Sequence, residues 1–196
     1  QLVLGTFHAV CVRFLRRWGT RLGLDPRFTI ADTDDARRLL RDVDRDAPVD
    51  ATLAAISRAK AHGWTPDELR ASAQHAPGSP AHTEHLALCR TYAAYQQQLR
   101  TSHALDFDDL LLLGVRLFRE HPELTTHIDH VLVDEFQDTN PAQLRLVELL
   151  AGGNDAAIAE ALDDAERVHP VRHRAWSDSA RWVHVILALT DPKGRC

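Results

Sequence analysis

Two adjacent carboxylates, Asp134 and Glu135, are the residues whose type and position most clearly indicate chemistry. They directly follow the apolar, β-branched run 131–133, which is typical of a strand buried on both faces. The acids therefore fall at the carboxyl end of a predicted parallel strand, where open α/β sheets bind ligands. Carboxylate oxygen is also the ligand that a hard divalent cation prefers. The alternative is that both acids only end a strand and begin a polar loop.

A helix is predicted shortly after the acids. Asn140 can cap its amino end, with Pro141 in the first turn and Gln143 three residues past the cap. Apolar side chains then recur on one face as far as Leu150, and the glycines at 152–153 end the helix. The two carboxylates are thus expected in a strand-to-helix connection.

The string Asp-Glu-Phe-Gln-Asp-Thr-Asn at residues 134–140 is more specific than a strand that ends in acids. It resembles the Walker B motif of UvrD/Rep/PcrA-type superfamily 1 DNA helicases. The resemblance implies ATP and Mg²⁺ as cofactors, with Asp134 holding the metal and Asp134 and Gln137 in the nucleotide site. It also implies that Glu135 is the catalytic residue, which positions or deprotonates the attacking water. Phosphoryl transfer needs this combination of charge neutralisation and a placed nucleophile.

The chain opens with a second recognisable segment. Residues 1–4 are predicted to form a strand, and a helix with an apolar stripe and a basic flank follows. Between them, Thr-Phe-His-Ala resembles the helicase family's Thr-Phe-His-Ser/Ala segment, which lies along the single-stranded DNA path. The resemblance implies DNA contacts from Thr6, Phe7 and His8, and hydroxyl, imidazole and helix-start amides suit phosphate. The alternatives are that Phe7 is a core residue and that the arginines of the helix are only solvated.

Residues 23–103 are predicted to form an all-helical insert, because no strand-like alternation occurs in this span. The predicted helix starts lie at Asp32 or Thr33, at Asp50, and at the capping box that runs from Thr65 to Glu68. The insert resembles the helical subdomain that the family carries within its first RecA-like domain. At Lys60 the resemblance implies a DNA phosphate contact near the duplex, and the alternative is an exposed helix lysine.

The string Leu-Asp-Phe-Asp-Asp-Leu at residues 105–110 is the third recognisable piece. It predicts a helix that is capped by Asp106 and has a second acid, Asp109, at its third position. The same string recurs in the helicase family just upstream of the Walker B motif. We interpret it as a family marker and as the return of the chain to the α/β core, not as a catalytic site.

These elements predict an α/β fold: a partial RecA-like parallel sheet with a large all-helical insert, predominantly helical overall. We expect residues 1–22 and 104–153 to form the partial ATPase core and residues 23–103 the inserted helical subdomain. Residues 154–196 are expected to be a divergent tail, with a possible strand at 183–189, in which the family's next motif is missing. A frameshifted end and a genuine fusion both account for such a tail.

Composition limits the class of protein. The hydrophobic share of 44% and the charged share of 26% are typical of a globular protein, and the formal net charge of −5 argues against a globally basic nucleic-acid binder. DNA contacts are therefore expected to be local. No membrane-length apolar stretch or signal peptide is found, and the odd count of 3 cysteines fits a reducing compartment, so we expect a cytoplasmic protein without a membrane partner.

The sequence contains no Gly-x-x-x-x-Gly-Lys-Ser/Thr loop to cradle phosphates. We therefore interpret the chain as a fragment of an ATP-dependent DNA helicase that is inactive in isolation. The resemblance implies that the whole protein couples ATP hydrolysis to translocation on single-stranded DNA and to duplex unwinding. Two alternatives remain: a non-catalytic DNA-binding module, and part of a helicase–nuclease subunit.

Overall fold

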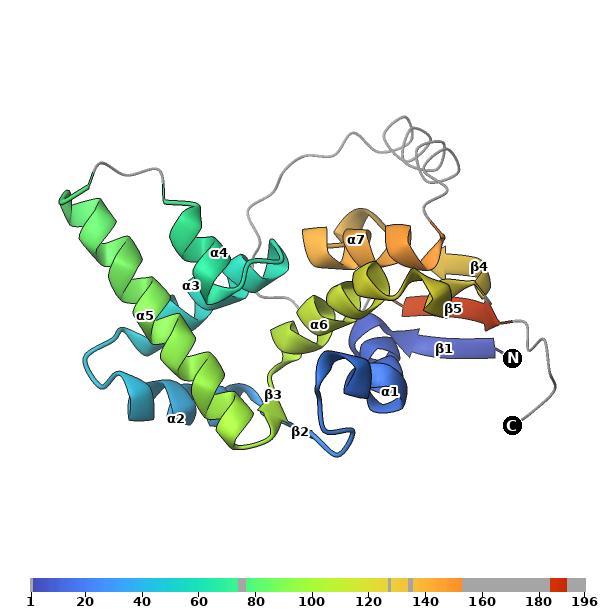
Figure 1. The fold of residues 1–196 in the computed structure, drawn as a ribbon, viewed down its shortest axis with the longest axis horizontal. Helices are drawn as coiled ribbons and strands as arrows, with labels where there is room; N and C mark the ends of the chain where they lie inside the picture. Colours follow the sequence, from blue (N-terminus) through green and yellow to red (C-terminus); the bar gives the residue numbers. More distant parts are fainter. Residues whose placement is uncertain (1, 74–76, 127, 134–135, 153–183, 190–196) are drawn as a thin grey trace.

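A computed structural model describes residues 2–73, 77–126, 128–133, 136–152 and 184–189 of the chain (Figure 1). The elements in chain order are β1 (Leu2–Thr6), α1 (Phe7–Trp18), η1 (Gly19–Leu22), β2 (Thr29–Ile30), α2 (Thr33–Val43), α3 (Val49–Ala61), α4 (Pro66–Ala71), α5 (Pro80–Thr101), β3 (Ala104–Leu105), α6 (Phe107–Glu120), η2 (Pro122–Thr125), β4 (Ile128–Val133), η3 (Phe136–Asp138), α7 (Pro141–Leu150) and β5 (His184–Leu189). The expectation of a predominantly helical α/β fold is confirmed.

The hydrophobic side chains form two clusters. One cluster joins the larger sheet to α1, α6 and α7, and its buried members come from residues 3–28 and 105–150. The other joins α2, α3, α4 and α5, with buried members from residues 31–104. Figure 1 shows the second group of helices on one side of the molecule and the larger sheet with its three helices on the other. This division is what a helical insert in an α/β core would give, and the domain boundaries themselves stay a prediction.

The larger sheet is three-stranded, in the order β1-β5-β4. β5 runs antiparallel to both neighbours, so β1 and β4 run parallel to each other on either side of it. The expected parallel pairing is found instead in the small β2–β3 sheet. The difference arises because β5, which coincides with the strand expected at residues 183–189, supplies the backbone hydrogen-bond partners of both β1 and β4.

The two faces of the larger sheet have different surroundings. Val3 is buried, and Val131 and Val133 pack against the cluster that contains α1, α6 and α7. Leu4 and Leu132 both pair in register with Ile186, so they lie on the same face, and they are 64% and 61% exposed. The described helices therefore cover one face of this sheet and leave an apolar row on the other.

The helix starts follow the capping signals of the sequence. Asn140 and Gln143 form a capping box on α7, with N–H to side-chain oxygen distances of 2.8 and 2.9 Å. Thr65 and Asp106 likewise begin α4 and α6 with capping boxes. The start of α3 differs, because Asp50 lies inside the helix and accepts a hydrogen bond from Arg37 at 2.9 Å instead of capping it.

Helices α1 and α6 approach each other closely where one of them has no side chain. A Cβ atom at Gly114 of α6 would lie 2.7 Å from the Sγ of Cys11 in α1, and both residues belong to the packed interior. A contact of that length requires a shift of the sulfur or of the helix. The glycine therefore sets the separation of α1 and α6.

We expect Gly114→Ala to lower the free energy of unfolding by about 1–3 kcal/mol, the usual cost of overpacking a core. Alanine is the better helix former, so an exposed helix glycine would respond in the opposite direction. Urea denaturation of the purified chain measures the change. Adding Cys11→Ala removes the clashing sulfur, so the double variant should lose less than the sum of the two single changes. A Gly114→Ala variant as stable as the original would contradict this account of the packing.

Candidate functional site

The site predicted from the sequence begins at one edge of the larger sheet. Gly5 of β1 and Val133 of β4 both pair with Val185, so the carboxyl ends of the two parallel-running strands meet at the same edge. Asp134 and Glu135 follow Val133 directly in the chain and lie outside the described residues. The side chain of Gln137, in η3, is also outside them. The structure thus gives the position of the strand end that precedes the acids, at the same sheet edge as the start of α1 and separated from β1 by β5.

The segment from Thr6 to His8 spans the turn from β1 into α1. Thr6 caps α1, and its Oγ1 accepts a hydrogen bond from the backbone N–H of Ala9 at 3.2 Å. Phe7 is 1% exposed and belongs to the core, so the expected DNA contact of its ring is corrected: the ring is enclosed by apolar side chains. His8 is half-buried, and this burial lowers the pKa of its imidazole, which favours the neutral form at pH 7.

An exposed aromatic ring lies beside this segment. Phe107, the first residue of α6, is 46% exposed, and its ring centroid lies 5.7 Å from that of His8 in an edge-on arrangement. The sequence did not single it out. Helical spacing places position 107 on the same stripe as the buried Leu110 and Leu111, and so predicts a core residue. The ring is exposed although Leu105 and Leu110, on either side of it in the chain, are buried in the cluster that contains α1 and α7.

A cavity of about 560 Å³ opens next to Phe107. Its walls come from α2, α3 and the first turn of α6, and they include the carboxylates of Asp32, Asp50 and Asp108. Burial and the nearby Asp106 raise the pKa of Asp108, and a hydrogen bond with Ser57 opposes that rise. The lining contains four aspartates, Asp32, Asp50, Asp106 and Asp108, and one cation, Arg37, which pairs with Asp50 at 2.9 Å. Acidic groups therefore predominate, so the cavity disfavours phosphate and accepts groups that donate hydrogen bonds.

Lys60 lies in a buried ionic network instead of on the surface. Its Nζ is 2.6 Å from Asp106 and 2.8 Å from Asp109, and its side chain is 0% exposed. The ammonium also lies over the ring of Tyr95, whose hydroxyl donates to Asp106 at 3.0 Å. The expected phosphate contact of Lys60 is therefore corrected, because two carboxylates and an aromatic ring enclose its amino group.

The same two aspartates have a second role that the sequence did predict. Asp106 accepts a hydrogen bond from the N–H of Asp109 at 2.8 Å, and Asp109 accepts one from the N–H of Asp106 at 3.3 Å, so together they form the capping box of α6. Burial lowers the pKa of Lys60, but the two carboxylates raise it more strongly and keep the amino group charged. Burial raises the pKa of Asp109, the negative charge of Asp106 adds to this rise, and the attraction of Lys60 opposes it.

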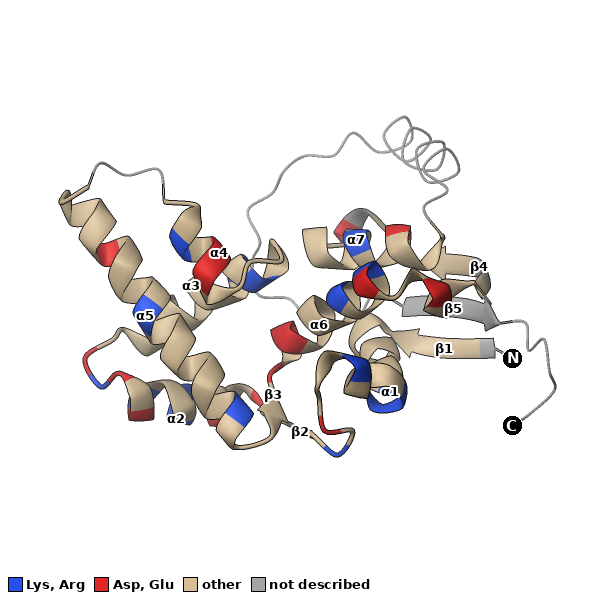
Figure 2. Cartoon of the chain, viewed as in Figure 1, with Lys and Arg blue, Asp and Glu red and all other residues tan. Residues whose placement is uncertain are grey.

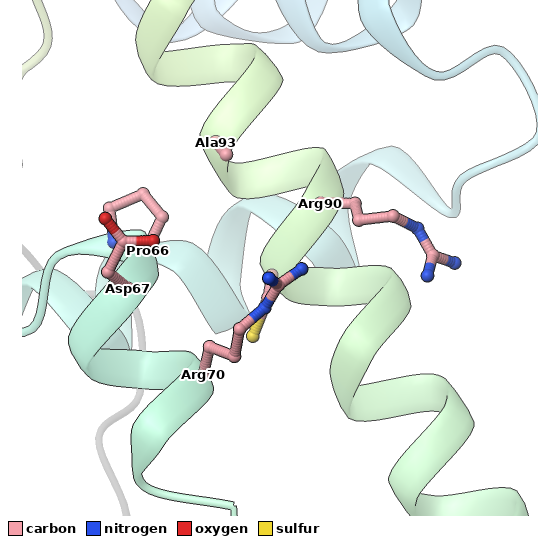
Figure 3. A pocket seen from close by; sticks show the side chains of 6 residues that line it. Pro66, Asp67, Arg70, Arg90 and Ala93 are labelled. Carbon is pink, nitrogen blue, oxygen red and sulfur yellow. The ribbon is translucent and has the colours of Figure 1, made fainter.

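A second cavity, of about 280 Å³, lies between α4 and α5 (Figure 3). In Figure 3 Arg70 extends from α4 toward α5, whereas Arg90 points away from the space between them. Polar groups therefore do not converge on one point, and we assign no ligand to this cavity.

Comparison with known proteins shows to which family the chain belongs. The model of the UvrD/REP helicase N-terminal domain matches residues 1–162 of the chain. The chain belongs to the UvrD/REP helicase family. It is 36% identical over 159 residues to the ATP-dependent DNA helicase PcrA of Staphylococcus aureus, a match that covers 76% of this chain and 21% of the relative. PcrA of Staphylococcus epidermidis matches with the same identity and coverage.

The chain thus spans about one fifth of the length of these UvrD/REP helicase relatives. The family match ends at residue 162, close to Gly153, after which the sequence motifs of the family are no longer recognisable. Within the described ranges, no three His, Cys, Asp or Glu side chains lie close enough to hold a metal ion. No helix in those same ranges is both long and apolar enough to cross a membrane.

We expect Lys60→Met to lower the free energy of unfolding by about 3–5 kcal/mol, because it leaves two buried carboxylates without their cation. Urea denaturation measures the change, and Arg58→Met, an exposed position on the same helix, is the matched control. Adding Asp109→Asn removes one of the uncompensated charges and should restore part of the loss. Equal stabilities of the Lys60 and Arg58 variants would show that the network contributes little.

Proposed function

We propose that this chain is the part of an ATP-dependent DNA helicase motor that carries its catalytic carboxylates and one section of its DNA path. The observation that carries the proposal is the shared sheet edge: β1 ends at Thr6 where β4 ends at Val133, immediately before the Walker B-like string. Residues about 125 positions apart in the sequence thereby lie at the same edge, where α/β sheets bind ligands, with β5 between the two strands. The whole protein would use ATP to translocate on single-stranded DNA and unwind duplex DNA, in the cytoplasm.

The proposed chemistry of the edge is phosphoryl transfer to water. The donor set suits Mg²⁺, a hard cation that takes carboxylate oxygen, and bound Mg²⁺ would neutralise charge on the phosphates of ATP. Asp134 would hold this metal, and Gln137 would contribute to the nucleotide site. Glu135 would orient the attacking water and accept its proton. The sequence has no glycine-rich phosphate loop, so the chain needs further motor segments to hold the phosphates.

The proposed DNA contacts lie at the start of α1 and α6. The Thr6 hydroxyl and the neutral imidazole of His8 suit hydrogen bonds to the strand. Phe107 offers the exposed ring on which a nucleobase can stack, the role that the buried Phe7 does not fill. Because the cavity beside Phe107 is acidic, the strand would turn its bases toward α6 and its phosphates toward α1.

The catalytic assignment is tested in a chimera in which residues 1–153 replace the corresponding part of S. aureus PcrA. We expect Glu135→Gln to slow ATP hydrolysis by ~10²-fold or more and to leave nucleotide binding largely intact, the scale of losing a general base. Glu148→Gln, in the exposed Arg145–Glu148 ion pair of α7, is the matched control and should hydrolyse at the parent rate. Asp134→Asn should weaken Mg²⁺-dependent nucleotide binding instead.

Steady-state phosphate release and equilibrium binding of a fluorescent ATP analogue separate these roles. A Glu135→Gln chimera that hydrolyses ATP at the parent rate would show that the acid pair is structural. The isolated chain serves as the reference and should release no phosphate.

The stacking assignment is tested on the chain itself. We expect Phe107→Ala to weaken binding of a labelled oligothymidylate by about 5- to 150-fold, the effect of losing one stacked base at about 1–3 kcal/mol. Trp64→Ala is the matched control, since Trp64 is a 38% exposed aromatic residue that stacks on His62 in the connection between α3 and α4. Fluorescence anisotropy measures both. If the two variants bind as tightly as the parent, Phe107 is not part of the DNA path.

A further inference from the structure

Helix α1 presents charge of one sign only. Its sequence, Phe7–Trp18, contains three arginines and no acid, and Arg13, Arg16 and Arg17 are all exposed. Figure 2 shows blue bands and no red on this helix, whereas the segment around α2 carries both colours. Such a concentration of positive charge is unusual in a chain with a net charge of −5. It creates a local electrostatic site on a protein that is otherwise acidic.

The arginines form one face of α1 that continues from the sheet edge. Positions 6, 9, 13 and 16 follow each other at spacings of three or four residues, so their side chains lie along the same side of the helix, and Arg17, four residues after Arg13, lies at the margin of that side. The buried Phe7, Cys11 and Leu15 lie on the opposite side of the helix. At 1.5 Å per residue, the face runs about 15 Å from Thr6 to Arg17. We call positions 6, 9, 13, 16 and 17 the arginine face.

The charges of the arginine face are not neutralised by neighbouring acids. Among the described residues, no ion pair within 4.0 Å involves Arg13, Arg16 or Arg17, although nearby arginines do pair, namely Arg21 with Glu123 and Arg27 with Asp25. Aromatic rings support two of them instead. The Cζ of Arg16 lies 5.7 Å from the centroid of Phe28, and that of Arg17 lies 5.0 Å from the centroid of Trp18. A ring attracts a guanidinium group without cancelling its charge, so the group stays available to an external anion.

We infer that the arginine face binds the sugar–phosphate backbone of a nucleic-acid strand that leaves the sheet edge at Thr6. The inference deepens the proposed function and rests on it for the class of ligand. A line of guanidinium groups matches a polyanion with regularly spaced phosphates, since each group forms paired hydrogen bonds to phosphate oxygens. Continuity with Thr6 favours nucleic acid over an acidic polypeptide, because the strand that contacts this hydroxyl then follows the helix. Binding there is independent of base sequence.

The test is the salt dependence of binding by the full 196-residue chain to a labelled oligothymidylate. Each lost phosphate contact reduces the slope of log K against log salt by about 0.7 for a single strand. The triple variant Arg13→Gln, Arg16→Gln, Arg17→Gln is therefore expected to reduce the slope by about 2. Replacing the same three residues by Lys keeps the charge and should keep most of the slope. Circular dichroism checks that every variant is folded.

The matched control removes the same charge from an exposed part of the helical segment, by changing Arg38, Arg41 and Arg45 to Gln. Its slope should equal that of the parent chain. An unchanged slope in the α1 variant, or an equal loss in the control, would overturn the inference. Displacement of the oligothymidylate by polyglutamate with the same dependence on the arginines would assign the face to an acidic polypeptide instead.

The proposed function fails separately from this inference. Inactive chimeras together with a slope change of about 2 would remove the ATPase role and keep the arginine face. Active chimeras together with an unchanged slope would keep the ATPase role and remove the arginine face.

Discussion

The buried ammonium of Lys60 connects the parts of this structure that the sequence separates. It lies between α3, which carries it, and the amino end of α6, where Asp106 and Asp109 are each within 2.8 Å. The tyrosine that covers it, Tyr95, comes from α5. A buried charge is costly, and it is tolerated where opposite charges and hydrogen bonds satisfy it together. The two hydrophobic clusters therefore meet at a polar contact with defined geometry, and the first turn of α6, including the exposed Phe107, has a fixed place relative to the helical segment.

The arrangement at the sheet edge depends on this fixed place. α6 packs against α1, and α1 begins where β1 ends, so the position of α6 also sets the position of Phe107 beside His8. The close approach at Gly114 leaves little freedom to slide one helix along the other. An aromatic ring, a half-buried imidazole and a strand end that leads into two carboxylates thus occupy one side of the molecule. These groups differ in chemistry, but the same packed helices hold all of them. This shared support explains how they could contact one ligand together.

Much of the local structure was predictable from short-range signals, and the corrections came from long-range contacts. Capping residues in the sequence indicate the starts of α4, α6 and α7, since the hydrogen bonds of a capping box span only three residues. Burial of Lys60 was not predictable, because its carboxylate partners lie 46 or more residues away and a lysine on a helix is usually exposed. The exposure of Phe107 was not predictable either, since periodicity indicates which face of a helix is buried but not how far each side chain is covered. The antiparallel position of β5 depends on pairing across almost the whole chain, and no local pattern contains that information.

The position of β5 in the chain has a consequence for folding during synthesis. β1 is synthesised well before its backbone partner in the sheet, residues 184–189. The helical segment and the Lys60 network need nothing beyond residue 109, so they can assemble while most of the sheet is still incomplete. In that interval the hydrogen-bonding edges of β1 and β4 are open, together with the apolar row that contains Leu4 and Leu132. A nascent chain would therefore pass through a stage in which a finished helical body carries unpaired strands, the stage at which a chaperone would be most useful.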